Sequence, residues 1–104
     1  MLIEVLYVPG CPHYEPAIRR LRKILRAEAV EAAIEEIAIA DELSACSLQF
    51  RGSPTIRING LDAEPDDRKV VGMACRLYAG GSGIPSEEML QRAVSAAKKS
   101  EGRT

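Results

Sequence analysis

The stretch from residue 2 to residue 14 constrains the fold more than any other part of the sequence. Leu2–Val8 is an almost continuous apolar run, which predicts a strand covered on both faces. Pro9-Gly10 then turns the chain, and Cys11 stands where a helix is predicted to begin. Pro12 suits the first helical turn, because the N–H that proline lacks has no partner there. A cysteine between a buried strand and a helix start is a specific context for a reactive thiol.

Helical periodicity predicts a first helix from about Pro12 to Ala29. One face of this helix is apolar, and the face opposite to it is basic. We interpret that face as solvated rather than as a nucleic-acid or membrane patch, because the formal net charge is −1 and aromatic residues are few. The apolar face comprises Ala17, Ile18, Leu21, Ile24, Leu25 and Ala29.

A second strand and a short second helix follow. Ala33–Ala40 is predicted as the strand, and Asp41 as the cap of a helix that runs through Phe50. Leu43, Cys46 and Phe50 recur at i, i+3 and i+7. This spacing predicts that Cys46 packs in the core.

The second half of the chain predicts two strands and a last helix. Strand three covers residues 54–59, and Asn59-Gly60 is a strong hairpin signal. The acidic stretch after it predicts a connection longer than a tight turn, leading to an antiparallel strand four at residues 71–78. Ser86 is predicted to cap the last helix, and residues 100–104 to form a frayed tail.

These elements predict an α/β fold with the order β-α-β-α-β-β-α. We expect a single domain over residues 1–104, with a four-stranded mixed sheet and helices on both faces. No charged leader and no long apolar segment is visible, so neither a signal peptide nor a membrane partner is predicted. Three widely spaced cysteines favour reactive or buried thiols in a reducing cytoplasm over a disulfide framework.

Two motifs and the element order resemble the thioredoxin-like superfamily over nearly the whole chain. The motifs are Cys11-Pro-His-Tyr14 after strand one and Ser53-Pro-Thr55 before strand three. The resemblance implies that Cys11 is the nucleophile and that Pro54 is a cis-proline lying against it. Tyr14 stands where the family places a second, resolving cysteine, so the resemblance does not extend to a thiol pair within this motif.

Within the superfamily, the sequence is most similar to the DF family (seleno)proteins, an uncharacterised bacterial group. Three segments carry that similarity: Leu6–Pro12, Phe50–Gly60 and Cys75–Tyr78. Some members of the group are labelled alkylmercury lyases. This label implies chemistry with thiolates and a soft metal.

The positive end of a helix dipole stabilises a thiolate, which favours Cys11 as a nucleophile. His13 assists if its side chain turns toward the sulfur. Cys75 is expected at the same end of the sheet, two strands or roughly 10 Å from strand one. A direct disulfide requires Cα atoms within about 7 Å, so it needs a local shift. Cys75 is therefore a resolving thiol, a second soft-metal ligand, or a buried strand residue.

The leading hypothesis is a thiol redox protein, with thiol–disulfide oxidoreductase as the enzymatic form. Cys11 attacks a disulfide, peroxide or electrophile, and Cys75 or an external thiol such as glutathione resolves the product. No cofactor or resident metal is required, and with one histidine and no paired cysteines a zinc site is not expected. The oligomeric state stays open. The residues expected to bind substrate are Pro12, His13, Tyr14, Ser53, Pro54 and Thr55.

Three alternatives compete with that hypothesis. The first is a glutathione-linked protein that resembles a monothiol glutaredoxin, with Gly80-Gly81-Ser82 as its tripeptide loop. The second is a protein that binds a mercury-type ion through Cys11 and Cys75. The third is an interaction module without chemistry.

Overall fold

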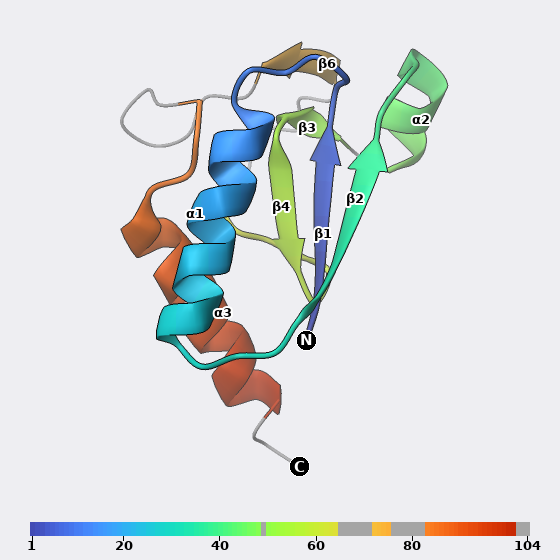
Figure 1. Cartoon of the computed structure of the whole chain (residues 1–104). Coiled ribbons are helices and arrows are strands. Elements are labelled where there is room, and N and C mark those ends of the chain that lie inside the picture. The colour runs from blue at the N-terminus through green and yellow to red at the C-terminus, as the bar shows by residue number, and fades with distance from the viewer. Residues whose placement is uncertain (49, 65–71, 76–82, 102–104) are drawn as a thin grey trace.

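The computed structural model describes residues 1–48, 50–64, 72–75 and 83–101 (Figure 1). The chain forms three helices and six strands within these residues. They follow one another as β1 (Leu2–Tyr7), α1 (Tyr14–Ala27), β2 (Ala33–Ala38), α2 (Glu42–Ser47), β3 (Arg51–Ser53), β4 (Thr55–Ile58), β5 (Leu61–Asp62), β6 (Gly72–Cys75) and α3 (Glu87–Glu101).

The main sheet has four strands in the order β2-β1-β4-β5. β1 runs parallel to β2 and antiparallel to β4, and β4 is antiparallel to β5. The predicted α/β architecture with a four-stranded mixed sheet is therefore confirmed. β2 lies at one edge of this sheet, where the side chains of Glu35 and Glu36 are exposed.

Both faces of the sheet carry apolar side chains, because successive residues of a strand point to opposite sides. Ile3 and Val5 pack under α1 and α3, which lie side by side on one face, while Leu6 packs near α2 on the other (Figure 1). The second cluster consists of Leu6, Ile39, Ala45 and Phe50. The larger cluster consists of Ile3, Val5, Ala17, Ile18, Leu21, Ile24, Leu25, Ile56, Ile58, Ala63, Leu90 and Val94.

The fourth strand of the sheet is not the one that the sequence predicts. Asn59 and Gly60 both have positive φ angles, 51° and 84°, so they form a tight two-residue turn and β5 pairs with β4 directly. The predicted antiparallel pairing of strand four with strand three (β4) is therefore wrong for the described residues 72–75. Within the predicted strand 71–78, the structure describes residues 72–75 as β6, which pairs in parallel with β3 in a separate two-stranded sheet.

The second helix is shorter than predicted, and Cys46 is exposed rather than packed in the core. Asp41 caps the helix as expected, since its Oδ1 accepts a hydrogen bond from the Ser44 N–H at 2.7 Å. The helix ends at Ser47, so Phe50 no longer follows its periodicity. Ala45 is the buried residue of α2 instead.

The two long helices keep their predicted inner faces but differ at their ends. α1 begins at Tyr14, two residues later than predicted, and the exposed Ala29 beyond its end has a φ of 51°. The other five predicted apolar residues of α1 are buried. Ser86 caps α3, since its hydroxyl oxygen accepts a hydrogen bond from the Met89 N–H at 3.1 Å. α3 continues through Glu101, two residues into the predicted frayed tail.

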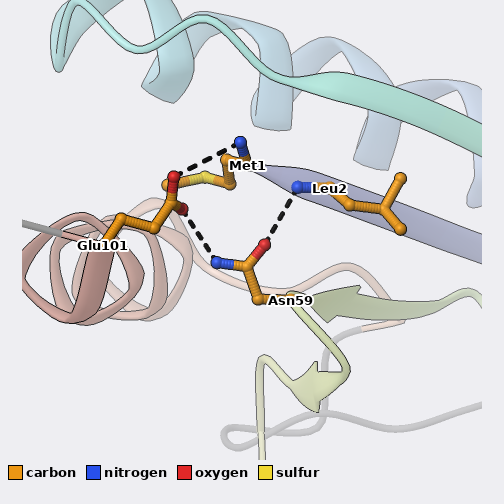
Figure 2. A network of polar contacts seen from close by, with 4 residues as sticks. All are labelled: Met1, Leu2, Asn59 and Glu101. Carbon is orange, nitrogen blue, oxygen red and sulfur yellow. Dashed lines mark hydrogen bonds and ion pairs between the residues drawn. The ribbon is translucent and has the colours of Figure 1, made fainter. Parts of the chain in front are cut away.

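A polar network explains why the end of α3 is ordered (Figure 2). The Asn59 side chain accepts a hydrogen bond from the Leu2 N–H at 2.9 Å and donates one to Glu101 at 2.8 Å. The Met1 ammonium lies 3.4 Å from the same carboxylate. The network joins β1, the β4–β5 turn and α3. No helix in the described part of the chain is long and apolar enough to cross a membrane.

Candidate functional site

Cys11 lies in the turn between β1 and α1 and is a half-buried free thiol. Its N–H donates to the Val8 carbonyl at 3.1 Å, and its carbonyl accepts from the Tyr14 N–H at 3.3 Å. These two bonds fix the backbone of Cys11 just before the N-terminal end of α1. Pro12 lies within this turn rather than in the helix, and it is exposed.

Ser53 connects this turn to the strand that carries Cys75. The Ser53 hydroxyl accepts a hydrogen bond from the Val8 N–H at 3.0 Å, and Ser53 is itself the register partner of Cys75 in the β3–β6 pair. The backbone of Cys75 therefore lies at the end of the sheet where β1 leads into Cys11 (Figure 1). The sequence predicts that position, although through pairing with a different strand.

The Ser53-Pro-Thr55 motif is buried, and the peptide bond between Ser53 and Pro54 is cis. Ser53 is 1% exposed and Thr55 is fully buried. The Thr55 hydroxyl donates to the Gly52 carbonyl at 2.6 Å. Both hydroxyls therefore make contacts within the protein, and direct substrate binding by this motif stays a prediction.

His13 is half-buried and lies against the segment that leads into α3. A Cβ atom built on Gly83 would come within 2.5 Å of Cδ2 and 2.6 Å of Nε2 of the His13 ring. No hydrogen bond between described residues joins His13 to Cys11. The sequence gives no indication of the Gly83 contact, since the two residues are distant along the chain.

Tyr14, the first residue of α1, belongs to a small polar and aromatic cluster. Its ring stacks on that of Tyr7 with centroids 3.9 Å apart, and its hydroxyl donates a hydrogen bond to the Glu36 carboxylate. Burial, followed by this hydrogen bond, raises the pKa of Tyr14 above its usual value. Tyr14 thus keeps its proton and anchors the start of α1 to the sheet.

Several predicted features lie outside the described residues. These include residues 76–78 of the predicted fourth strand and the Gly80-Gly81-Ser82 loop. Among the described residues, no three or more His, Cys, Asp and Glu side chains form a group that could hold a metal ion.

A scan against protein-family models finds no match to this chain, and a search of curated proteins finds none either.

Proposed function

We propose that the protein is a thioredoxin-like thiol redox protein in which Cys11 is the nucleophile and Cys75 the resolving thiol. The observation that supports this most is the arrangement of the β1–α1 turn. A half-buried free thiol stands just before a 14-residue helix, and Val8 and Ser53 link its turn to the strand that ends at Cys75.

The environment of Cys11 suits a nucleophile in three respects. The thiol is partly accessible, so a substrate sulfur can approach it. The N-terminal end of α1 favours negative charge nearby. The backbone bonds from Cys11 to Val8 and Tyr14 hold the residue in one position before it reacts.

The proposed reaction is thiol–disulfide exchange. The Cys11 thiolate attacks one sulfur of a substrate disulfide, forms a mixed disulfide and releases the other sulfur as a thiolate. The Cys75 thiolate then attacks Sγ of Cys11 and releases the second substrate thiolate. The substrate gains two electrons and the protein is left with a Cys11–Cys75 disulfide. An external dithiol reduces that bond and closes the cycle.

Cys75 suits the resolving role because Tyr14 occupies the position three residues after Cys11. A resolving thiol must therefore come from another element or from solution. The last residue of β6, Cys75, pairs with Ser53. The Ser53 hydroxyl in turn accepts a hydrogen bond from the N–H of Val8, which lies three residues before Cys11. A disulfide requires Cα atoms within about 7 Å, so the proposed cycle needs the turn and β6 to meet within that distance.

Peptide mapping by mass spectrometry after mild peroxide treatment, with and without reductant, tests this proposal. The Cys46→Ser background is used, because Cys46 is exposed and crosslinks between molecules there would obscure the result. We expect a reversible Cys11–Cys75 disulfide that is absent from the Cys11→Ser and Cys75→Ser variants.

Two other outcomes would change the assignment. Sulfenic acid or a glutathione adduct at Cys11, with Cys75 still reduced, would replace Cys75 by an external thiol as the resolving group. An unmodified Cys11 would contradict a redox nucleophile altogether. In that case binding of Hg²⁺ to the wild type, and its loss in Cys11→Ser, would separate a thiolate metal site from a module without chemistry.

A further inference from the structure

The segment Gly83–Ser86, which leads into α3, is anchored to α1. Ile84 packs against the larger core cluster, and Pro85 is almost fully buried. The Pro85 carbonyl accepts a hydrogen bond from Arg20 Nη1 at 2.9 Å. The residue before this anchored pair, Gly83, is therefore held at a fixed place beside the helix.

At that place Gly83 leaves room for the His13 ring. A Cβ on residue 83 would come within 3 Å of three ring atoms, including Cγ at 2.9 Å, which is closer than non-bonded carbon atoms approach one another. The ring therefore cannot keep its position if residue 83 carries a side chain. His13 is also the residue just before α1, where its side chain makes no capping hydrogen bond.

We propose that Gly83 is a positioning residue, which sets the orientation of the His13 imidazole in the turn that carries Cys11. This inference rests on the proposed role of Cys11 and adds to it a second element, the loop before α3. Cys11 and His13 lie in one turn, which is closed by the hydrogen bond that the Tyr14 N–H donates to the Cys11 carbonyl. An imidazolium held in this turn favours a thiolate at Cys11 by charge attraction.

The first test observes the ring itself. His13 is the only histidine of the chain, so its imidazole proton resonances are identified in an NMR spectrum without assignment. We expect Gly83→Ala to shift these resonances while the protein stays folded, because the ring moves by side-chain rotation. Unchanged resonances in a folded Gly83→Ala protein would overturn the inference.

The second test measures the local charge that Cys11 experiences. In a Cys46→Ser, Cys75→Ser background Cys11 is the only thiol, since the chain has three cysteines. We compare its alkylation rates with anionic iodoacetate and neutral iodoacetamide. The iodoacetate-to-iodoacetamide ratio should fall on the order of threefold in His13→Ala, because the variant removes from this turn the one side chain whose protonated form would attract the anionic reagent. Gly83→Ala should lower it in the same direction.

A double-mutant cycle separates the ring contact from a backbone effect. In the His13→Ala background, Gly83→Ala should leave the alkylation ratio unchanged, because the clashing ring is absent. Equal effects of Gly83→Ala in both backgrounds would show that the residue acts through the backbone and would overturn the proposal. An unaltered ratio in His13→Ala would overturn it as well.

These readouts distinguish failure of this inference from failure of the proposed function. If Cys11 resists both reagents and peroxide, the redox role fails, while the NMR test still decides the contact between Gly83 and His13. If Cys11 reacts normally and neither His13→Ala nor Gly83→Ala changes the alkylation ratio, the redox role stands and the positioning role fails.

Discussion

The two ends of β1 are held in opposite ways. At the carboxyl end, the buried Ser53 hydroxyl receives the Val8 N–H, and the chain then turns into a half-buried thiol. At the amino end, an exposed network of Asn59, Glu101 and the chain terminus ties three elements together (Figure 2). A bond to a buried hydroxyl is costly to lose, because the partly buried group left behind has little access to water. Exposed polar contacts exchange with water and contribute little.

This difference indicates that contacts at the two ends of β1 have different effects on stability and on the reactivity of Cys11. The buried Ser53 contact fixes the geometry around Cys11, so changes there should alter both stability and thiol reactivity. The exposed network holds element ends in place, so changes there should alter stability less than changes at Ser53 and leave the thiol unaffected. Three substitution experiments test the comparison, beginning with the largest expected effect.

Ser53→Ala should lower the free energy of unfolding by about 1–3 kcal/mol, because the Val8 N–H loses its acceptor in a partly buried position. It should also raise the alkylation rate of Cys11, since the turn that follows Val8 is loosened. Urea denaturation and iodoacetamide kinetics in the Cys46→Ser, Cys75→Ser background measure the two effects.

Thr55→Val is the matched control for Ser53→Ala. It removes a neighbouring buried hydroxyl whose bond to the Gly52 carbonyl is local. Some stability should be lost, but the Cys11 rate should not change. Equal rate changes in the two variants would mean that Ser53 has no special role in the turn. A stability loss below about 0.5 kcal/mol in Ser53→Ala would count against its buried bond.

Asn59→Ala should cost about 1–2 kcal/mol, the sum of two lost exposed hydrogen bonds and an alanine at a φ of 51°. Asn59→Gly removes the same bonds but accepts the positive φ, so it should cost less than Asn59→Ala. Urea midpoints measure both. Cys11 alkylation should match that of the parent, and an altered rate would break the comparison between the two ends.

The smallest effect is a pH dependence at Glu101. The hydrogen bond from Asn59, with a further contribution from the chain-terminal ammonium, holds the pKa of the Glu101 carboxyl below its ordinary value. A lowered folded-state pKa adds stability above the ordinary glutamate pKa, and this stability is lost as the pH falls through the lowered one.

Glu101→Gln isolates this contribution from that of the other carboxyl groups. The wild type should be more stable than the variant at pH 7, and the difference between their urea midpoints should close as the pH falls below about 4. A gap that persists to pH 2 would assign the difference to something other than the ionised carboxylate.

The elements that the sequence predicts well are governed by neighbouring residues. The inner face of α1 follows from a 3.6-residue period, and the caps at Asp41 and Ser86 follow from side chains that bond three residues ahead. The Asn59-Gly60 turn follows from the two residue types that tolerate positive φ. Each of these signals depends on residues that are close together in the sequence.

The features that the sequence does not predict depend on distant partners. The β3–β6 pairing joins segments about twenty residues apart, and an apolar segment alone does not identify the strand that it joins. The contact between His13 and Gly83 requires two loops to meet. The predicted burial of Cys46 is wrong for a local reason. It relies on a helical period that extends to Phe50, but α2 ends at Ser47 and Cys46 is exposed.

The edge position of β2 also affects how copies of the protein meet. An edge strand presents backbone N–H and C=O groups on which another strand can align and begin aggregation. Glu35 and Glu36 are exposed neighbours in β2, so their carboxylates project from opposite faces of the sheet. A second β2 strand aligned there would bring like charges together on both faces. Charge repulsion therefore opposes the edge-to-edge pairing of sheets from different copies, by which fibres would grow.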